Sequence, residues 1–178
     1  MGFLLIAFAT GSLEGVSSLF FYLLVYVIMT LNIWSVVLFL SYRNKVNIRY
    51  LTDLQNLSKT NPVLAFTISM NLFSMAGVPP LAGFFAKMYV FFSGLEVSLN
   101  LIVITGIIMS VLSAFYYLRL IKLMYFDGAY QGVFFSLNKG FKIVYVLGFT
   151  LIIIVFLFLN PDILILFTEC LGIFLFSC

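Results

Sequence analysis

Histidine is absent from this chain of 178 residues, and cysteine occurs only at Cys170 and Cys178. These two residue types supply most of the protein ligands for haem, zinc, copper and iron–sulfur clusters. We therefore expect no metal site and no redox cofactor on this chain. The two cysteines lie in an apolar segment without the spacing of a metal site, and we interpret them as small hydrophobic residues.

Charged residues are also scarce. They make up 8% of the chain, whereas 64% of its residues are hydrophobic. Soluble domains carry roughly 25% charged residues, so this composition excludes a water-soluble fold, and we expect the lipid bilayer rather than nucleic acid around the chain. Lipid tolerates no exposed irregular backbone, and each helical crossing needs about 20 mostly apolar residues. The composition predicts an all-α integral membrane protein with room for four or five helices.

Long apolar segments alternate with short polar ones along the chain. The last apolar segment contains Asp162 and Glu169, and we expect it to form an interfacial or re-entrant end rather than another crossing. The pattern as a whole predicts a partial helix over 1–13, transmembrane helices over 19–41, 98–126 and 143–159, a broken transmembrane helix over 62–92, and an apolar tail over 160–178.

The distribution of charge predicts the orientation of these segments. If the spans alternate in direction, every basic residue except Lys87 falls on one side of the membrane, which the positive-inside rule assigns to the matrix or the cytoplasm. Glu14, Glu96 and the two acidic residues of the tail fall on the opposite side. The inner-side basic residues are Arg43, Lys45, Arg49, Lys59, Arg119, Lys122, Lys139 and Lys142.

Lys87 is the exception, because it lies inside an apolar segment. A lysine at the membrane interior costs at least about 2.5 kcal/mol, so it normally faces a partner or a hydrated cavity. The structural alternative is that its side chain extends to the outer surface. Helical rise places Lys87 about 12 Å from the outer end of its segment, whereas a lysine side chain reaches about 6 Å. This spacing favours a functional lysine over one whose side chain extends to the outer surface, and both interpretations stay open.

Four residues that disrupt helices precede Lys87: Gly77, Pro79, Pro80 and Gly83. Proline removes an amide donor and glycine permits unusual dihedral angles, so the helix cannot be continuous here. The freed carbonyl groups then need partners from protein or water. A simple proline kink is the alternative, but a discontinuous helix in mid-membrane is a known device for placing ions and water.

Two polar stripes flank the break at helical spacing. Each could hold a chain of water molecules, but serine and threonine also bond their own helix or join two helices, and we leave both alternatives open. The stripe residues are Thr67, Asn71 and Ser74 in the first, and Ser110, Ser113 and Tyr117 in the second.

The run NLFSMAGVPPLAGFFAKMYVF, from Asn71 to Phe91, resembles the signature SLAG(I/V)PP-x-x-GF-x-x-K-x-x-x-F of subunit 2 of NADH dehydrogenase, a subunit of respiratory complex I. SAFYYLRLIKLMY, which begins at Ser113, resembles the next helix of that family. GFLLIAFATGSLEGVSSLFFYLLVYVIMTL, which begins at Gly2, resembles the preceding helix end and span. The resemblance therefore covers nearly the whole chain.

This family is antiporter-like and is similar to subunits of Mrp-type cation/proton antiporters. The resemblance implies that the chain supplies the C-terminal four to five helices of a 14-helix fold, with one broken transmembrane helix. Lys87 then matches the lysine of that broken helix, which the family uses for proton transfer near the outer side. The implied function is proton translocation by a non-redox subunit of NADH:ubiquinone reductase, with NADH, FMN, iron–sulfur clusters and ubiquinone elsewhere in the complex. A subunit of an Mrp-type antiporter and a structural membrane scaffold are the alternatives.

The family's N-terminal portion has no counterpart in this sequence. We expect a split gene whose other product supplies that portion, next to neighbouring subunits of the membrane arm, and a cropped chain is the alternative. Phenylalanine is abundant, with 22 residues, and arginine is sparse, which fits the AT-rich genome of an organelle. This bias favours the mitochondrial inner membrane over a bacterial or plastid energy-transducing membrane.

Overall fold

The computed structural model describes residues 2–44, 51–55, 57–79, 81–126 and 141–177, and every regular element in these ranges is helical. The elements are α1 (Gly2–Ala9), α2 (Leu13–Asn44), a 3₁₀ turn (Leu51–Leu54), α3 (Leu57–Thr60), α4 (Pro62–Ala76), α5 (Ala82–Glu96), α6 (Asn100–Tyr125), α7 (Phe141–Leu159) and α8 (Asp162–Ser177).

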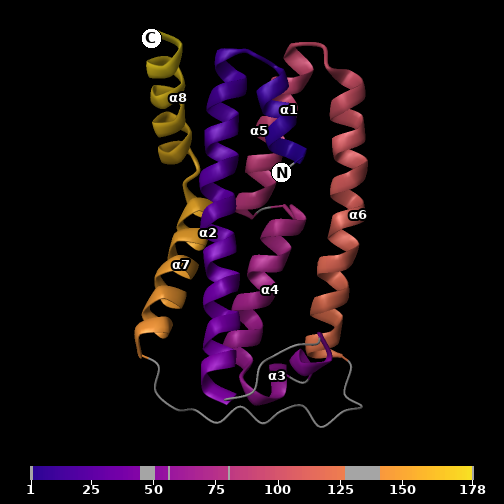
Figure 1. The fold of residues 1–178 in the computed structure, drawn as a ribbon, viewed down its shortest axis with the longest axis vertical. Coiled ribbons are helices and arrows are strands. Elements are labelled where there is room, and N and C mark those ends of the chain that lie inside the picture. Colours follow the sequence, from indigo (N-terminus) through magenta and orange to yellow (C-terminus); the bar gives the residue numbers. More distant parts are fainter. Residues whose placement is uncertain (1, 45–50, 56, 80, 127–140, 178) are drawn as a thin grey trace.

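Helix α2 is the centre of the bundle (Figure 1). It packs against α1, α4, α5, α7 and α8, whereas α6 packs on the opposite side of α4 and α5. By length and composition, α2 and α6 can each cross a bilayer, and α7 with α8 can make another crossing if the bent pair is a single span. Most apolar side chains of α6 are exposed, which suits a surface in contact with lipid or with another membrane protein.

The segment predicted as a broken helix consists of α4 and α5, which lie end to end with their junction near mid-height of the bundle (Figure 1). One end of the bundle holds α3, the end of α6 and the start of α7. The other end holds the turn between α5 and α6 and the C-terminus. Lys59, Arg119 and Lys122 lie toward the first end, and Glu14 and Glu96 lie at the second.

The C-terminal segment, which we expect to form an interfacial or re-entrant end, is helical in the structure. It forms α8, which is joined to α7 through Asn160 and Pro161 at a bend of 87° and packs along α2. Small residues permit this contact, because Thr168 is fully buried and Gly172 faces the Ser17 side chain of α2. The expected span over 143–159 corresponds to α7, which together with α8 forms either a broken span or a re-entrant loop.

Two apolar clusters hold the bundle together, one on each side of the break. The cluster next to α1 and α5 includes Phe21, Val25 and Val90, and the cluster next to α4 and α6 includes Leu40 and Met124. Because α2 contributes to both clusters, it fixes the two halves of the broken helix relative to each other. Lys87 lies on α5 between Ala86 and Val90 of the first cluster, and its Nζ reaches the end of α4.

Candidate functional site

The break begins where α4 ends in a left-handed turn. Gly77 has φ 85° and ψ 37°, and its N–H donates to the carbonyl oxygens of Phe73 and Ser74 at 3.1 Å. The N–H of Val78 also donates to Phe73 O at 3.1 Å. This is a Schellman-type end, in which glycine takes a positive φ that other residues adopt only at a cost. It satisfies two of the four carbonyl groups that a helix leaves free at its C-terminus.

Lys87 satisfies the other two. Its Nζ donates to Met75 O at 3.0 Å and to Ala76 O at 2.9 Å. The last four carbonyl groups of α4 therefore all have partners, as buried backbone in a membrane requires. The carbonyl dipoles at a helix C-terminus also favour a positive charge. Lys87, which is only 8% exposed, does not extend to the outer surface but turns toward the break.

One of the three hydrogen-bonding directions of Lys87 Nζ has no carbonyl partner. A protonated lysine has three N–H donors, and the two carbonyl groups occupy two of them. A neutral amine can keep the same two bonds and direct its lone pair along the third direction. This site can therefore exchange one proton without losing the two bonds that hold it in place.

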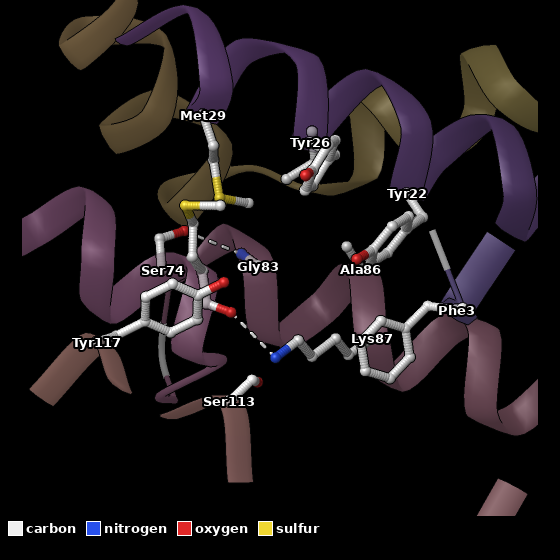
Figure 2. Close-up of a pocket in the computed structure, with 13 residues that line it drawn as sticks. Phe3, Tyr22, Tyr26, Met29, Ser74, Gly83, Ala86, Lys87, Ser113 and Tyr117 are labelled. Carbon is white, nitrogen blue, oxygen red and sulfur yellow. Dashed lines mark hydrogen bonds between the residues drawn. The ribbon is translucent and has the colours of Figure 1, made fainter. Parts of the chain in front are cut away.

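A cavity of about 170 Å³ adjoins Lys87 (Figure 2). By the same measure one water molecule needs about 10–15 Å³, so the cavity can hold several. Helices α1, α2, α4, α5 and α6 all contribute to its wall. The lining residues are Gly2, Phe3, Tyr22, Val25, Tyr26, Met29, Ser74, Met75, Gly83, Ala86, Lys87, Ser113 and Tyr117.

Close packing of α4 against α5 shapes the break. The N–H of Gly83 donates to Ser74 Oγ at 3.2 Å, and a Cβ at Gly83 would overlap the Ser74 carbonyl oxygen. A Cβ at Gly77 would lie 3.1 Å from both Cδ and Nζ of Lys87. Gly83 is therefore needed for space, whereas Gly77 is needed for its backbone angles and a Cβ there would crowd the Lys87 side chain. Pro79 lies in the turn between the helices, and Pro80 lies outside the described residues.

The outward side of the lysine is covered by an aromatic group from α1. Phe3 lies with its ring centroid 5.4 Å from Lys87 Nζ. The Phe3 ring also contacts Phe91 and Tyr22, each at a centroid distance of 5.8 Å. The short helix α1 therefore contributes to the outward wall of the cavity, and its Phe3 ring lies close to the Lys87 amine.

The residues of the two predicted polar stripes do not all lie at the Lys87 cavity. Ser74, Ser113 and Tyr117 line the Lys87 cavity. Ser110 does not line it and donates to its own helix at Ile107 O. Thr67 and Asn71 line a separate apolar cavity of about 470 Å³ between α2, α4 and α7.

Hydrogen bonds account for the two residues of the first stripe that lie away from Lys87. Thr67 donates to its own helix at Leu64 O. The Asn71 amide donates to Met29 O of α2 at 2.8 Å, which joins the two helices. These bonds describe packing, whereas Ser74, one turn further along α4, contacts the break itself.

Other components of the site have weaker signals in the sequence. The carbonyl groups of Met75 and Ala76 are backbone atoms, so their residue types give no indication of their role. Phe3 lies in a segment too short to be recognised as a span. Tyr22 and Tyr26 are spaced by one helical turn, and that spacing shows only that they share a face of α2.

A second polar cluster joins α2, α5 and α8 toward the outer end. Tyr89 shares a hydrogen bond of 3.1 Å with Ser17, and its hydroxyl donates to Glu169 Oε1 at 3.4 Å. The hydroxyl groups of Ser18 and Ser93 also share a bond of 3.1 Å. Glu169 therefore has a partner on the broken helix.

The sequence model described as "NADH:quinone oxidoreductase/Mrp antiporter, TM" matches residues 1–113. NADH-ubiquinone oxidoreductase chain 2 of Marchantia polymorpha is 42% identical over 169 residues, which cover 95% of this chain and 34% of the relative. NADH-quinone oxidoreductase subunit N of Methylobacterium nodulans is 43% identical over 144 residues, which cover 81% of this chain and 30% of the relative. The chain thus spans about a third of the length of these relatives.

The fold is similar to that of a chain in the structure of respiratory complex I from Thermus thermophilus with bound aureothin. The TM-score is 0.73 at 23% sequence identity, and the match covers 92% of this chain and 36% of that chain. The similarity includes nearly all of the described helices.

Proposed function

Because this chain belongs to the NADH:quinone oxidoreductase/Mrp antiporter family of membrane proteins, we propose that it is a proton-translocating subunit in the membrane arm of an NADH:quinone oxidoreductase. Its fold is all-α and corresponds to the C-terminal part of an antiporter-like subunit with one broken transmembrane helix. The relatives matched over most of this chain are chain 2 and subunit N of that enzyme.

One observation carries the proposal. Lys87 lies inside a membrane helix, is held by two carbonyl groups of a broken helix, and adjoins a cavity with room for water. Ionisable residues within membrane segments are costly and mark ion or proton routes. The arrangement supplies a proton-binding group, a fixed position for it, and a space through which a proton can reach it.

The chemistry follows from the two protonation states of the amine. Protonation is favoured by the α4 carbonyl groups and opposed by burial away from water. A lysine in such a balance changes its proton affinity when nearby charges move. Lys87 can therefore take up a proton when the balance favours the ammonium and release it when a charge change elsewhere in the complex favours the amine.

The partners and cofactors belong to the same proposal. A polypeptide equivalent to the remaining portion of the longer relatives completes the antiporter-like fold, and neighbouring membrane-arm subunits contact the exposed helices. NADH, FMN, iron–sulfur clusters and ubiquinone act elsewhere in the complex, and this chain carries none of them. The setting is an energy-transducing membrane, and the composition favours the mitochondrial inner membrane. In that membrane, the end of the bundle that carries Lys59, Arg119 and Lys122 faces the matrix.

Replacing Lys87 by methionine tests the proposal. Methionine keeps an unbranched side chain of similar length but can neither donate to the α4 carbonyl groups nor bind a proton. We expect the complex that contains Lys87→Met to assemble and to lose most of its proton pumping, measured as acidification of sealed vesicles per NADH oxidised.

Arg119→Gln is the control, because it removes an exposed charge from the inner end of α6 and should change pumping little. Normal pumping by an assembled Lys87→Met complex would sink the proposal. It would leave the structural scaffold, in which Lys87 only satisfies the end of α4, as the better explanation. Association with a sodium-transporting assembly in place of NADH oxidation would instead favour the Mrp-type antiporter.

A further inference from the structure

Three tyrosines share the cavity with Lys87, and the mechanism above does not use them. Helix α2 supplies Tyr22 and Tyr26, and α6 supplies Tyr117 (Figure 2). The rings of Tyr22 and Tyr26 stack with centroids 6.0 Å apart and an interplanar angle of 13°. Tyrosine is both a donor and an acceptor of hydrogen bonds, so three such groups around one space can pass protons as well as line it.

The hydroxyl groups of these tyrosines are free to bond water. Within the described part of the chain, none of the three forms a hydrogen bond with another protein group. Asn71 Oδ1 also has no hydrogen-bond partner, but it is fully buried, whereas the three tyrosine hydroxyl groups line a cavity. A buried phenol without a protein partner normally bonds water, and the cavity that the three residues line has room for it.

Their positions place the three tyrosines around Lys87. Tyr26 lies one helical turn from Tyr22 toward the basic end of α2, and Tyr117 lies one turn from Ser113 toward the basic end of α6. The Lys87 side chain also turns toward that end, because its Nζ reaches the last carbonyl groups of α4. Tyr117 therefore lies on the inward side of Nζ, whereas Tyr22 lies with Phe3 on its outward side (Figure 2), so the tyrosines surround the amine.

We propose that Tyr22, Tyr26 and Tyr117 relay protons to and from Lys87 through hydrogen-bonded water in their shared cavity. This inference rests on the proposed function and names the side chains that deliver the proton. Tyr26 and Tyr117 bond the water in the rest of the cavity. Tyr22 lies nearest to Phe3 and bonds the water next to Nζ.

The transfer balances without any other reactant. A water molecule gives a proton to a phenol oxygen while that phenol gives its own proton to the next water molecule, so one O–H bond forms as another breaks. The last water molecule protonates the lone pair of neutral Lys87, which becomes an ammonium group. Each tyrosine ends the transfer neutral and needs only to rotate its hydroxyl group before the next one.

The test removes single hydroxyl groups and keeps the rings. Tyr26→Phe and Tyr117→Phe delete no hydrogen bond to another described protein group, so we expect both variants to assemble. Tyr116→Phe is the matched control, because Tyr116 precedes Tyr117 on α6 but is 68% exposed. General acid–base groups typically contribute about 100-fold or more, and because water can partly replace a phenol we expect the double variant to pump about tenfold more slowly.

A second measurement separates proton delivery from packing. In the unmodified complex, several protons move together, so the pumping rate should depend on the deuterium fraction of the solvent along a curve rather than a straight line. A straight line for the unmodified complex would overturn the inference even if the tyrosine variants failed to assemble. Pumping by the double variant at the rate of Tyr116→Phe would overturn it as well.

The two proposals can fail separately. If Lys87→Met abolishes pumping and the double tyrosine variant does not slow it, the lysine is a proton site and the tyrosines are not its route. If an assembled Lys87→Met complex pumps normally, the proposed function fails and the inference fails with it. Slow pumping by both, with Tyr116→Phe unchanged, is the result expected.

Discussion

The chain interrupts its apolar helices at two places with proline, and the surroundings of the two breaks differ. Between α4 and α5, the freed carbonyl groups of Met75 and Ala76 bond Lys87 from the following helix, beside a cavity. Between α7 and α8, the hydrogen bonds in the described residues are backbone bonds, in which Asn160 N–H donates to Phe156 O and Ile165 N–H donates to Pro161 O. Asn160 is exposed there.

This difference shows what a break needs in order to act as a site. Proline and glycine are sufficient to interrupt a helix, and the α7–α8 junction uses the interruption to change direction by 87°. The α4–α5 junction adds an ionisable side chain that takes the place of the missing backbone donors. It is the pairing of Lys87 with the end of α4 that makes this break capable of proton chemistry.

The largest effect should come from filling the close contact between α4 and α5. Gly83→Ala places a methyl group against the Ser74 carbonyl oxygen, and the backbone cannot move aside without separating the two half-helices. We expect a loss of about 3 kcal/mol of stability or more, seen as a strongly reduced yield of assembled complex on native gels.

Gly148→Ala is the control, because Gly148 lies on α7, on the way to the second break, and a Cβ there meets nothing within 4 Å. It should assemble normally. Equal yields from the two alanine variants would show that the contact at Gly83 is not needed and that the two breaks are more alike than the structure indicates.

A smaller and more selective effect is expected at Gly77. Alanine at a positive φ costs about 1–2 kcal/mol, and here its Cβ would also crowd Lys87 Nζ at 3.1 Å. We expect Gly77→Ala to lower both assembly and the pumping rate of the complex that does assemble, because Nζ is pushed away from the two carbonyl groups.

Gly11→Ala separates the two causes. Gly11 also has a positive φ of 59°, but a Cβ there meets nothing within 4 Å, so only the backbone cost applies. Assembly should fall in both variants, whereas pumping per assembled complex should fall only in Gly77→Ala. A similar pumping rate in the two variants would mean that the position of Nζ does not matter.

Local chemistry explains why the break and Lys87 could be predicted from the sequence. Gly77 and Pro79 disrupt a helix whatever surrounds them, and a single lysine in an apolar segment is conspicuous for its cost. Gly83, also expected in the break, lies instead in the first turn of α5. The helical class and the broken helix are confirmed by the structure. The role of the site residues remains a prediction that the variants above address.

The remaining features depend on contacts between helices. The docking of α8 on α2 follows from the fit of Gly172 against Ser17, and an apolar tail with two acidic residues gives no sign of it. The convergence of Tyr22 and Tyr117 requires α2 and α6 to lie on either side of α5. Ser110 and Ser113 belong to the same stripe in the sequence, but only Ser113 lines the cavity. Tertiary packing, which the spacing does not show, decides which turn of the helix faces inward.

Proton pumping by Lys87→Gln tests the central claim most directly, because glutamine separates the two roles of Lys87. Its amide N–H groups can still donate to the carbonyl groups of Met75 and Ala76, but it cannot take up a proton. The account predicts that the complex with Lys87→Gln assembles better than the one with Lys87→Met and yet translocates as few protons per NADH oxidised. Normal pumping by the assembled Lys87→Gln complex would contradict the account, because Lys87 would then be needed only to complete the end of α4.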